Sequence, residues 1–219
     1  MRFCKSLVAV LLGLGCAVAA RAQAGVYLGY TATRLSGIKC FAIAPVTCSS
    51  VNGVVNPAGI QAGAYYDFKT VGPARLGVDV RGGVFNSNKS ATASAGSINS
   101  TGYDNLLVGL KGSFHTRYSW LVPYAQVSAG YARSNATEPF TLGLSATATP
   151  TPRVEDSFIE YVGIVGLAVH VFSFVDLRPI ELGIGNMNRI AGGTAVDGPA
   201  SVGVMTIGAS VVLHMPSSQ

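Results

Sequence analysis

The stretch ARLGVDVRGGVF, residues 74–85, decides the fold. Leu76, Val78 and Val80 occupy alternate positions, and the positions between them hold glycine or a charged residue. Successive side chains of a β-strand point to opposite faces, so this period of two predicts a strand with one apolar and one polar face. A helix of about 3.6 residues per turn would mix the two kinds of residue on every face.

The same alternation recurs along the chain between clusters of Gly, Pro, Ser and Asn. Runs rich in Val, Tyr, Leu and Ile that end at such clusters are typical of strands. Eight strands are predicted, at residues 25–35, 59–69, 74–85, 103–114, 120–133, 158–172, 176–186 and 202–215. The chain is therefore expected to be all-β.

The spacers between the predicted strands alternate in length. Long spacers span about 36–58, 86–102, 134–157 and 187–201, and short ones span 70–73, 115–119 and 173–175. A meander closed into a barrel in an outer membrane has long loops outside and short turns on the periplasmic side. The sequence thus predicts an eight-stranded antiparallel up-and-down transmembrane β-barrel.

The polar faces of the strands distinguish a membrane barrel from a soluble sandwich. Only 11% of the residues are charged, against 49% hydrophobic residues and 27 glycines. A soluble sheet would cover its polar face with Lys, Glu and Thr, whereas here that face holds glycines and charges of both signs. In the opposite register Arg75 and Arg81 would face lipid. An arginine on the lipid face near the midplane of the bilayer destabilises a barrel by about 2–4 kcal/mol. We therefore expect the apolar faces to point to lipid and the charged faces into the lumen.

The first 24 residues have the pattern of a secretory signal peptide. Arg2 and Lys5 give a positive start, residues 6–20 are apolar, and AQA at 22–24 supplies small residues for cleavage. A transmembrane anchor is the alternative, but the apolar run is shorter than the roughly 20 residues that a span needs. A lipoprotein signal, with Cys16 as the lipidated residue, is a further alternative.

Cleavage after Ala24 leaves a barrel over 25–215 and a short tail over 216–219. The full chain has a net charge of +5, and removal of the three basic residues before the cut leaves twelve basic and ten acidic residues, a balance of +2. No cluster of Lys or Arg remains, which argues against nucleic-acid binding. The expected location is the outer membrane of a Gram-negative-type bacterium.

Two of the four cysteines, Cys40 and Cys48, remain after the predicted cleavage. An exported chain meets an oxidising compartment, so we expect a Cys40–Cys48 disulfide that closes a short loop containing Pro45. Two reduced cysteines that do not meet are the alternative. No CxxC, HExxH or Cys/His pair with the spacing of metal ligands occurs, so no cofactor is expected.

The inward faces of the predicted strands carry four acidic and four basic residues. A barrel of eight strands is just wide enough to be filled by its own side chains, and buried charges persist only when they are paired and hydrogen-bonded. We predict an ionic network that plugs the barrel; a gated, charge-lined pore is the alternative. Its members are Asp67, Lys69, Arg75, Asp79, Arg81, Lys111, Glu160 and Glu181.

Residues 25–215 resemble the small outer-membrane barrels of the OmpA, OmpX and OmpW kind. The resemblance rests on the leader, the eight alternating segments, the long–short spacers and the amphipathic last strand at 202–215. It implies the barrel fold, contact with outer-membrane lipid and insertion by the outer-membrane assembly machinery, and it implies no catalytic or binding signature. Members usually end their last strand at a terminal aromatic, whereas this strand ends at Met215 and a PSSQ tail follows.

Three histidines, His115, His170 and His214, fall on inward positions at the short-turn ends of the predicted strands. The favoured interpretation is that neutral imidazoles line the barrel mouth and hydrogen-bond to turn backbone, with a metal site as the alternative. A lipid-modifying enzyme would need a Ser-His-carboxylate arrangement at the outer rim, which these histidines do not reach. No catalytic, cofactor or metal-ligating residues are therefore expected.

Function is expected at the long loops. Loop 36–58 has an apolar tip, which motivates the hypothesis that this loop, with loop 134–157, contacts an extracellular partner. The predicted function is a structural or surface-interaction role without catalysis. The alternatives are a narrow channel for small or apolar solutes and, more remotely, a lipid-modifying outer-membrane enzyme.

Overall fold

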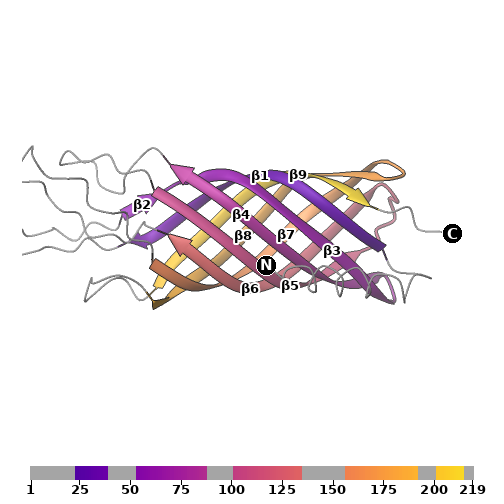
Figure 1. Ribbon diagram of the computed structural model, residues 1–219. Helices are drawn as coiled ribbons and strands as arrows, with labels where there is room; N and C mark the ends of the chain where they lie inside the picture. The colour runs from indigo at the N-terminus through magenta and orange to yellow at the C-terminus, as the bar shows by residue number, and fades with distance from the viewer. Residues whose placement is uncertain (1–22, 39–52, 88–100, 135–155, 192–200, 215–219) are drawn as a thin grey trace, which may run out of the picture.

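A computed structural model describes residues 23–38, 53–87, 101–134, 156–191 and 201–214 of the chain (Figure 1). The described residues form nine strands: β1 (Gln23–Ile38), β2 (Gly53–Val55), β3 (Ala58–Val71), β4 (Ala74–Ser87), β5 (Thr101–Phe114), β6 (Leu121–Ser134), β7 (Asp156–Phe172), β8 (Val175–Ala191) and β9 (Ser201–His214). Within these ranges no helix is long and apolar enough to cross a membrane.

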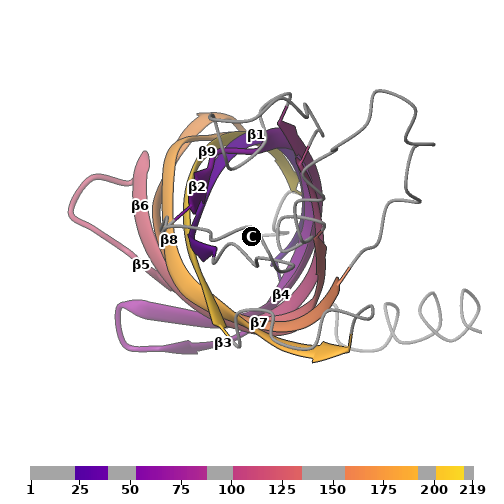
Figure 2. The same cartoon turned by 90° about the vertical axis from the view of Figure 1, so that its left-hand side faces the viewer.

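The strands form one antiparallel sheet that closes on itself. Each strand from β3 to β8 pairs with the next one along the chain, and β1 pairs with both β3 and β9. The β1–β9 seam runs through twelve residue pairs, from Gly25–His214 to Ser36–Gly203. Figure 2 shows the resulting closed wall of strands. Eight strands form this wall, and the three-residue β2 adds to the far end of β1, so the predicted up-and-down barrel is confirmed.

Short turns gather at one end of the barrel, as the spacing predicts. They connect β3 to β4, β5 to β6 and β7 to β8, and the first residue of β1 and the last of β9 lie at the same end (Figure 1). The turn between β3 and β4 consists of Gly72 and Pro73, and Gly72 has a φ of +58°. Glycine adopts this left-handed conformation without the Cβ clash of other residues. We call this end the turn end and the opposite one the loop end.

The outer face of the barrel is apolar. On β5, Leu106, Val108 and Leu110 are 56–62% exposed, whereas Leu107 between them is buried in the lumen. Exposed aromatic residues gather at the turn end, where the rings of Tyr118 and Trp120 lie 6.1 Å apart. A lipid-facing apolar band bordered by aromatic residues is the arrangement of transmembrane β-barrels, and the alternation in residues 74–85 has the predicted register.

Six of the eight barrel strands are longer than the sequence predicts, because the ladder of hydrogen bonds continues past the apolar band. β8 ends at Ala191 instead of 186, and β2 forms inside the predicted spacer 36–58. β1 begins at Gln23, and Gln23 and Ala24 pair with Asp67 and Tyr66 of β3. Two residues placed before the predicted cleavage point therefore belong to the barrel wall. The rest of the predicted signal peptide, residues 1–22, lies outside the described residues, and its cleavage stays a prediction.

Candidate functional site

The lumen at the loop end is filled by apolar side chains. Nine residues form this cluster, which we call the apolar plug: Leu35, Val55, Phe85, Tyr103, Ala132, Phe158, Met187, Val202 and Val204. The rings of Phe85 and Tyr103 stack with their centroids 5.1 Å apart. Because every member is at most 2% exposed, the plug leaves no wide aqueous path among the described side chains at this end.

One carboxylate lies against the apolar plug. Glu160 is 1% exposed and accepts hydrogen bonds from the Tyr103 hydroxyl at 2.5 Å and from the Asn105 side-chain amide at 3.2 Å. The Asn105 amide also donates to the Tyr103 hydroxyl at 2.8 Å. A buried carboxylate is costly unless hydrogen bonds replace the lost water, and these two neighbours supply them.

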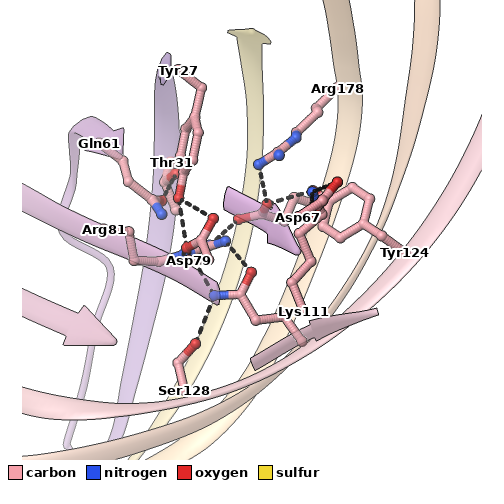
Figure 3. A network of polar contacts seen from close by, with 12 residues as sticks. Tyr27, Thr31, Gln61, Asp67, Asp79, Arg81, Lys111, Tyr124, Ser128 and Arg178 are labelled. Atoms are coloured by element: carbon pink, nitrogen blue, oxygen red, sulfur yellow. Dashed lines mark hydrogen bonds and ion pairs between the residues drawn. The ribbon is translucent and has the colours of Figure 1, made fainter. Parts of the chain in front are cut away.

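An ionic cluster centred on Arg81 fills the middle of the lumen (Figure 3). Arg81 is 2% exposed. Its Nε donates to Asp79 at 3.0 Å, one terminal nitrogen donates to Glu181 at 2.5 Å, and the other donates to the Gln126 side-chain oxygen at 2.8 Å. The planar fork of a guanidinium suits this use, because its donors point in several fixed directions. Strands β4, β6 and β8 are thereby joined across the lumen.

Neutral side chains complete the hydrogen bonding of the two carboxylates. The Tyr27 hydroxyl donates to Asp79 at 2.9 Å, and the Gln126 amide donates to the same carboxylate at 2.9 Å. The Tyr124 hydroxyl donates to the second oxygen of Glu181 at 2.5 Å. Asp79, which is 0% exposed, is therefore fully enclosed and fully hydrogen-bonded, which is the condition for a stable buried charge.

A second charged layer lies nearer the turn end. Lys111 donates to Asp67 at 3.1 Å and lies 3.5 Å from the centroid of the Tyr65 ring. Arg178 is 3% exposed, and its guanidinium carbon lies 4.5 Å from the Tyr27 ring centroid and 4.8 Å from that of Tyr124. Ring faces attract cations, so these tyrosines stabilise the buried guanidinium. A terminal nitrogen of Arg178 also lies 3.9 Å from a carboxylate oxygen of Glu181.

A cavity of about 450 Å³ occupies the turn end of the lumen. Asp67, Lys111 and Arg178 line its inner part, and all three histidines border it. His115 lies beside turn backbone, with its Nδ1 3.3 Å from the Pro73 carbonyl oxygen, as the sequence-based interpretation expects. His170 and His214 differ, because both rings face a carboxylate.

The structure brings six of the eight residues predicted for the ionic network into the lumen interior. Asp79, Arg81 and Glu181 form one cluster, Asp67 and Lys111 form a pair, and Glu160 lies apart with Tyr103. Arg75 is half-buried at the mouth and donates to the Gln23 side-chain oxygen. Lys69 is exposed outside the network. A bulge between Asp67 and Lys69 interrupts the regular pairing of β3 with β4. Beyond this bulge, the alternation of residues no longer predicts which side chains of β3 point into the lumen.

Two charged lumen residues, Asp176 and Arg178, were not predicted from the sequence. With Glu181 inward, strict alternation along β8 would turn both of them to lipid. The β8–β9 register instead shifts between Arg178 and Glu181, so residues on both sides of Pro179 point inward. Proline cannot donate a ladder hydrogen bond and is tolerated at bulges, so Pro179 was the signal that a bulge could be expected here.

The remaining predicted features lie outside the described residues. These are the Cys40–Cys48 disulfide, most of the loop 36–58, and the loop 134–157 apart from its ends. The disulfide and the extracellular contacts therefore stay predictions.

Comparison with known proteins finds similar solved structures and no sequence match. No family model and no curated protein sequence match the chain. Among solved structures it is similar to the attachment invasion locus protein Ail of Yersinia pestis, which was solved in complex with the heparin analogue sucrose octasulfate. The two chains are 13% identical with a TM-score of 0.49, and the match covers 89% of this chain and 99% of Ail. It is also similar to Neisserial surface protein A, at 14% identity and a TM-score of 0.46 over 86% and 96%.

A third solved structure similar to this chain is the outer-membrane protease OmpT of Escherichia coli. The identity is 11% and the TM-score 0.35, over 90% of this chain and 97% of that one. A likeness of this degree does not carry an activity over to this chain, because function resides in sites placed on a fold. The role of this chain must therefore be argued from its own lumen and surface.

Proposed function

We propose that the chain is an outer-membrane barrel with a plugged lumen and a structural or surface-interaction role, without catalysis. The observation that carries the proposal is the filling of the lumen at two levels. The apolar plug occupies the loop end, and the Arg81 cluster occupies the middle, with Arg81 and Asp79 at most 2% exposed. The apolar belt around these layers supports placement in a lipid bilayer.

A non-catalytic role is supported by the surroundings of His115 and His170. The His170 ring faces Asp176, and the His115 ring lies near the Pro73 carbonyl and Arg75. In the described part of the chain, neither ring has a serine, threonine or cysteine within hydrogen-bonding distance. Nucleophilic catalysis needs such a pair, and both rings lie at the turn end, away from the long loops.

The surface-interaction part of the proposal rests on the apolar tip of loop 36–58. Outer-membrane barrels carry their long loops on the external side, so this tip would be available to a partner on another cell or in a matrix. Deletion of residues 39–49 is expected to abolish binding of intact cells to such a surface. Unchanged binding would contradict this part of the proposal.

Planar-bilayer recording tests the plugged lumen. Because the plug and the Arg81 cluster leave no wide aqueous path among the side chains that the structure describes, the purified chain is expected to insert into the bilayer without stable conductance steps. Heat-unfolded protein added at the same concentration serves as the control for detergent artefacts. Reproducible unit steps with the folded protein, absent from the unfolded control, would contradict a plugged lumen and favour the channel alternative.

A further inference from the structure

His170 of β7, Asp176 of β8 and His214 of β9 meet at the turn-end mouth of the lumen. The β7–β8 register places His170 directly opposite Asp176. The β8–β9 register places Asp176 opposite Val212, two residues before His214 and on the same face. Three neighbouring strands therefore each supply one side chain to the same point, beside the seam where β9 meets β1.

The three side chains converge through their metal-ligating atoms. Nδ1 of His170 lies 2.5 Å from Oδ1 of Asp176, and Nε2 of His214 lies 3.1 Å from the same oxygen. Each residue offers one ligating atom, and these three atoms all lie within 4.8 Å of one another. The two ring centroids are 6.0 Å apart at 71°, so the rings approach the oxygen from different directions.

Two imidazoles and one carboxylate are a ligand set for divalent transition metals. Zinc binds His nitrogen and carboxylate oxygen at about 2.0–2.2 Å, and such ligands around a tetrahedral ion lie roughly 3.3 Å apart. The two nitrogen–oxygen distances, 2.5 and 3.1 Å, are shorter than this value, so an ion is admitted when side-chain rotations open the two contacts to Asp176. We infer that His170, Asp176 and His214 form a binding site for one divalent transition-metal ion such as Zn²⁺.

The surroundings allow an ion to enter and to complete its coordination. All three residues line the cavity of about 450 Å³ at the turn end. The side chains of Asp176 and His214 are 7% exposed, whereas that of His170 is 38% exposed and faces the opening. Water from the cavity can fill the remaining coordination positions, as in sites with three protein ligands. The backbone N–H groups of His170 and His214 donate to Trp120 and Phe174, which fixes the two strand positions.

The third histidine at this mouth belongs to a different environment. His115 lines the same cavity, but Nδ1 of its ring lies 3.3 Å from the Pro73 carbonyl and Nε2 lies 3.4 Å from a nitrogen of Arg75. A cation beside the Arg75 guanidinium would be repelled. His115 is therefore the matched control for the two proposed ligands, because it has the same side chain and lines the same cavity.

A bound metal ion would link β9 to β7 and β8 through its ligands. A ligand that binds only the folded barrel stabilises it in proportion to the logarithm of its concentration. The folded form should then persist to higher temperature when Zn²⁺ is present, as measured by the temperature at which the faster-migrating folded band is lost from a detergent gel. The proposal is independent of the structural or surface role, because it needs only the folded barrel.

The experiment uses the full chain, refolded in detergent without a histidine tag and with its four cysteines alkylated so that thiolates bind no metal. After addition of ZnCl₂ and desalting, zinc is counted by atomic emission, and its affinity is measured by calorimetry. The variants are His170→Gln, Asp176→Asn and the control His115→Gln. A band of folded mobility on the gel confirms that each variant has formed a barrel.

The expected result is one zinc per folded chain for the native protein and for His115→Gln. His170→Gln and Asp176→Asn should bind at least about tenfold more weakly, since loss of a group that merely supports a ligand already costs that much. Zinc should raise the temperature of gel unfolding in the native chain and in His115→Gln alone. The inference is overturned if the folded native chain retains no zinc, if all variants bind it equally, or if His115→Gln loses it as well.

Discussion

Replacing Arg81 by methionine is expected to lower the free energy of unfolding by about 3–5 kcal/mol, the cost of removing one partner from a buried ion pair. Arg81 is 2% exposed and donates to Asp79, Glu181 and Gln126. Methionine fills similar volume, so the loss comes from charge and hydrogen bonds and not from a cavity. Tyr27 and Gln126 still donate to Asp79 after the change, which keeps the cost within this range.

Lys69→Met is the matched control for Arg81→Met. Both residues are basic and both were predicted from the sequence to join the network, but Lys69 is exposed. Its replacement should change the free energy of unfolding by no more than about 0.5 kcal/mol. Urea titration of refolded protein in lipid vesicles measures both values. Equal effects of the two substitutions would show that Arg81 is not a buried centre of the lumen.

Val108→Arg should lower the free energy of unfolding by about 2–4 kcal/mol, because it places a charge on the lipid face near the middle of β5. Val108 is 56% exposed and pairs with Val80 and Ala129 on the neighbouring strands. If this position faced water, an arginine here would leave the free energy of unfolding almost unchanged. In lipid the guanidinium must lose its hydration or distort the bilayer, and the same vesicle titration measures the cost.

Val71→Arg makes the same chemical change at the end of the belt. Val71 is 51% exposed and is the last residue of β3, next to the Gly72 turn. At an interface the cost of arginine falls to about 0–1 kcal/mol, so the two substitutions should differ by depth alone. If both variants were as stable as the native chain, the apolar face would not be in contact with acyl chains.

The fold could be predicted because the sequence repeats one simple rule. In residues 74–85 the alternation assigns each side chain to lipid or lumen, and the same rule holds through most of β5 and β9. Strand ends were less predictable. Beyond the belt, both faces tolerate mixed residues, so the sequence gives no sign that β8 continues to Ala191 or that Gly53–Val55 pairs with β1.

The lumen site was predicted only where the alternation is unbroken. Asp79, Arg81 and Lys111 lie in regular stretches and occupy the expected face. Bulges change the face of everything beyond them, which exposes Lys69 and buries Arg178. Pro179 marks the bulge in β8, whereas no glycine or proline marks the one between Asp67 and Lys69, which depends on the pairing of β3 with its neighbours in the sheet.

The convergence of His170, Asp176 and His214 shows the same limit. The sequence placed both histidines at one end of the lumen. It did not place Asp176 beside them, because the bulge at Pro179 reverses the expected face of this residue. Two histidines at a barrel mouth without a carboxylate beside them do not point to a metal site. The sequence therefore favoured neutral imidazoles that hydrogen-bond to turn backbone.

Depth-dependent fluorescence quenching tests the central claim, a barrel that spans a bilayer, most directly. The chain has one tryptophan, Trp120, which is exposed in the aromatic cluster at the turn end. In vesicles of lipids brominated at defined acyl positions, Trp120 should be quenched best by shallow bromines. The double variant Val108→Trp, Trp120→Phe should be quenched best by bromines at the bilayer centre. If neither tryptophan were quenched by acyl-chain bromines at any depth, this face of the barrel would not lie in lipid and the account would be wrong.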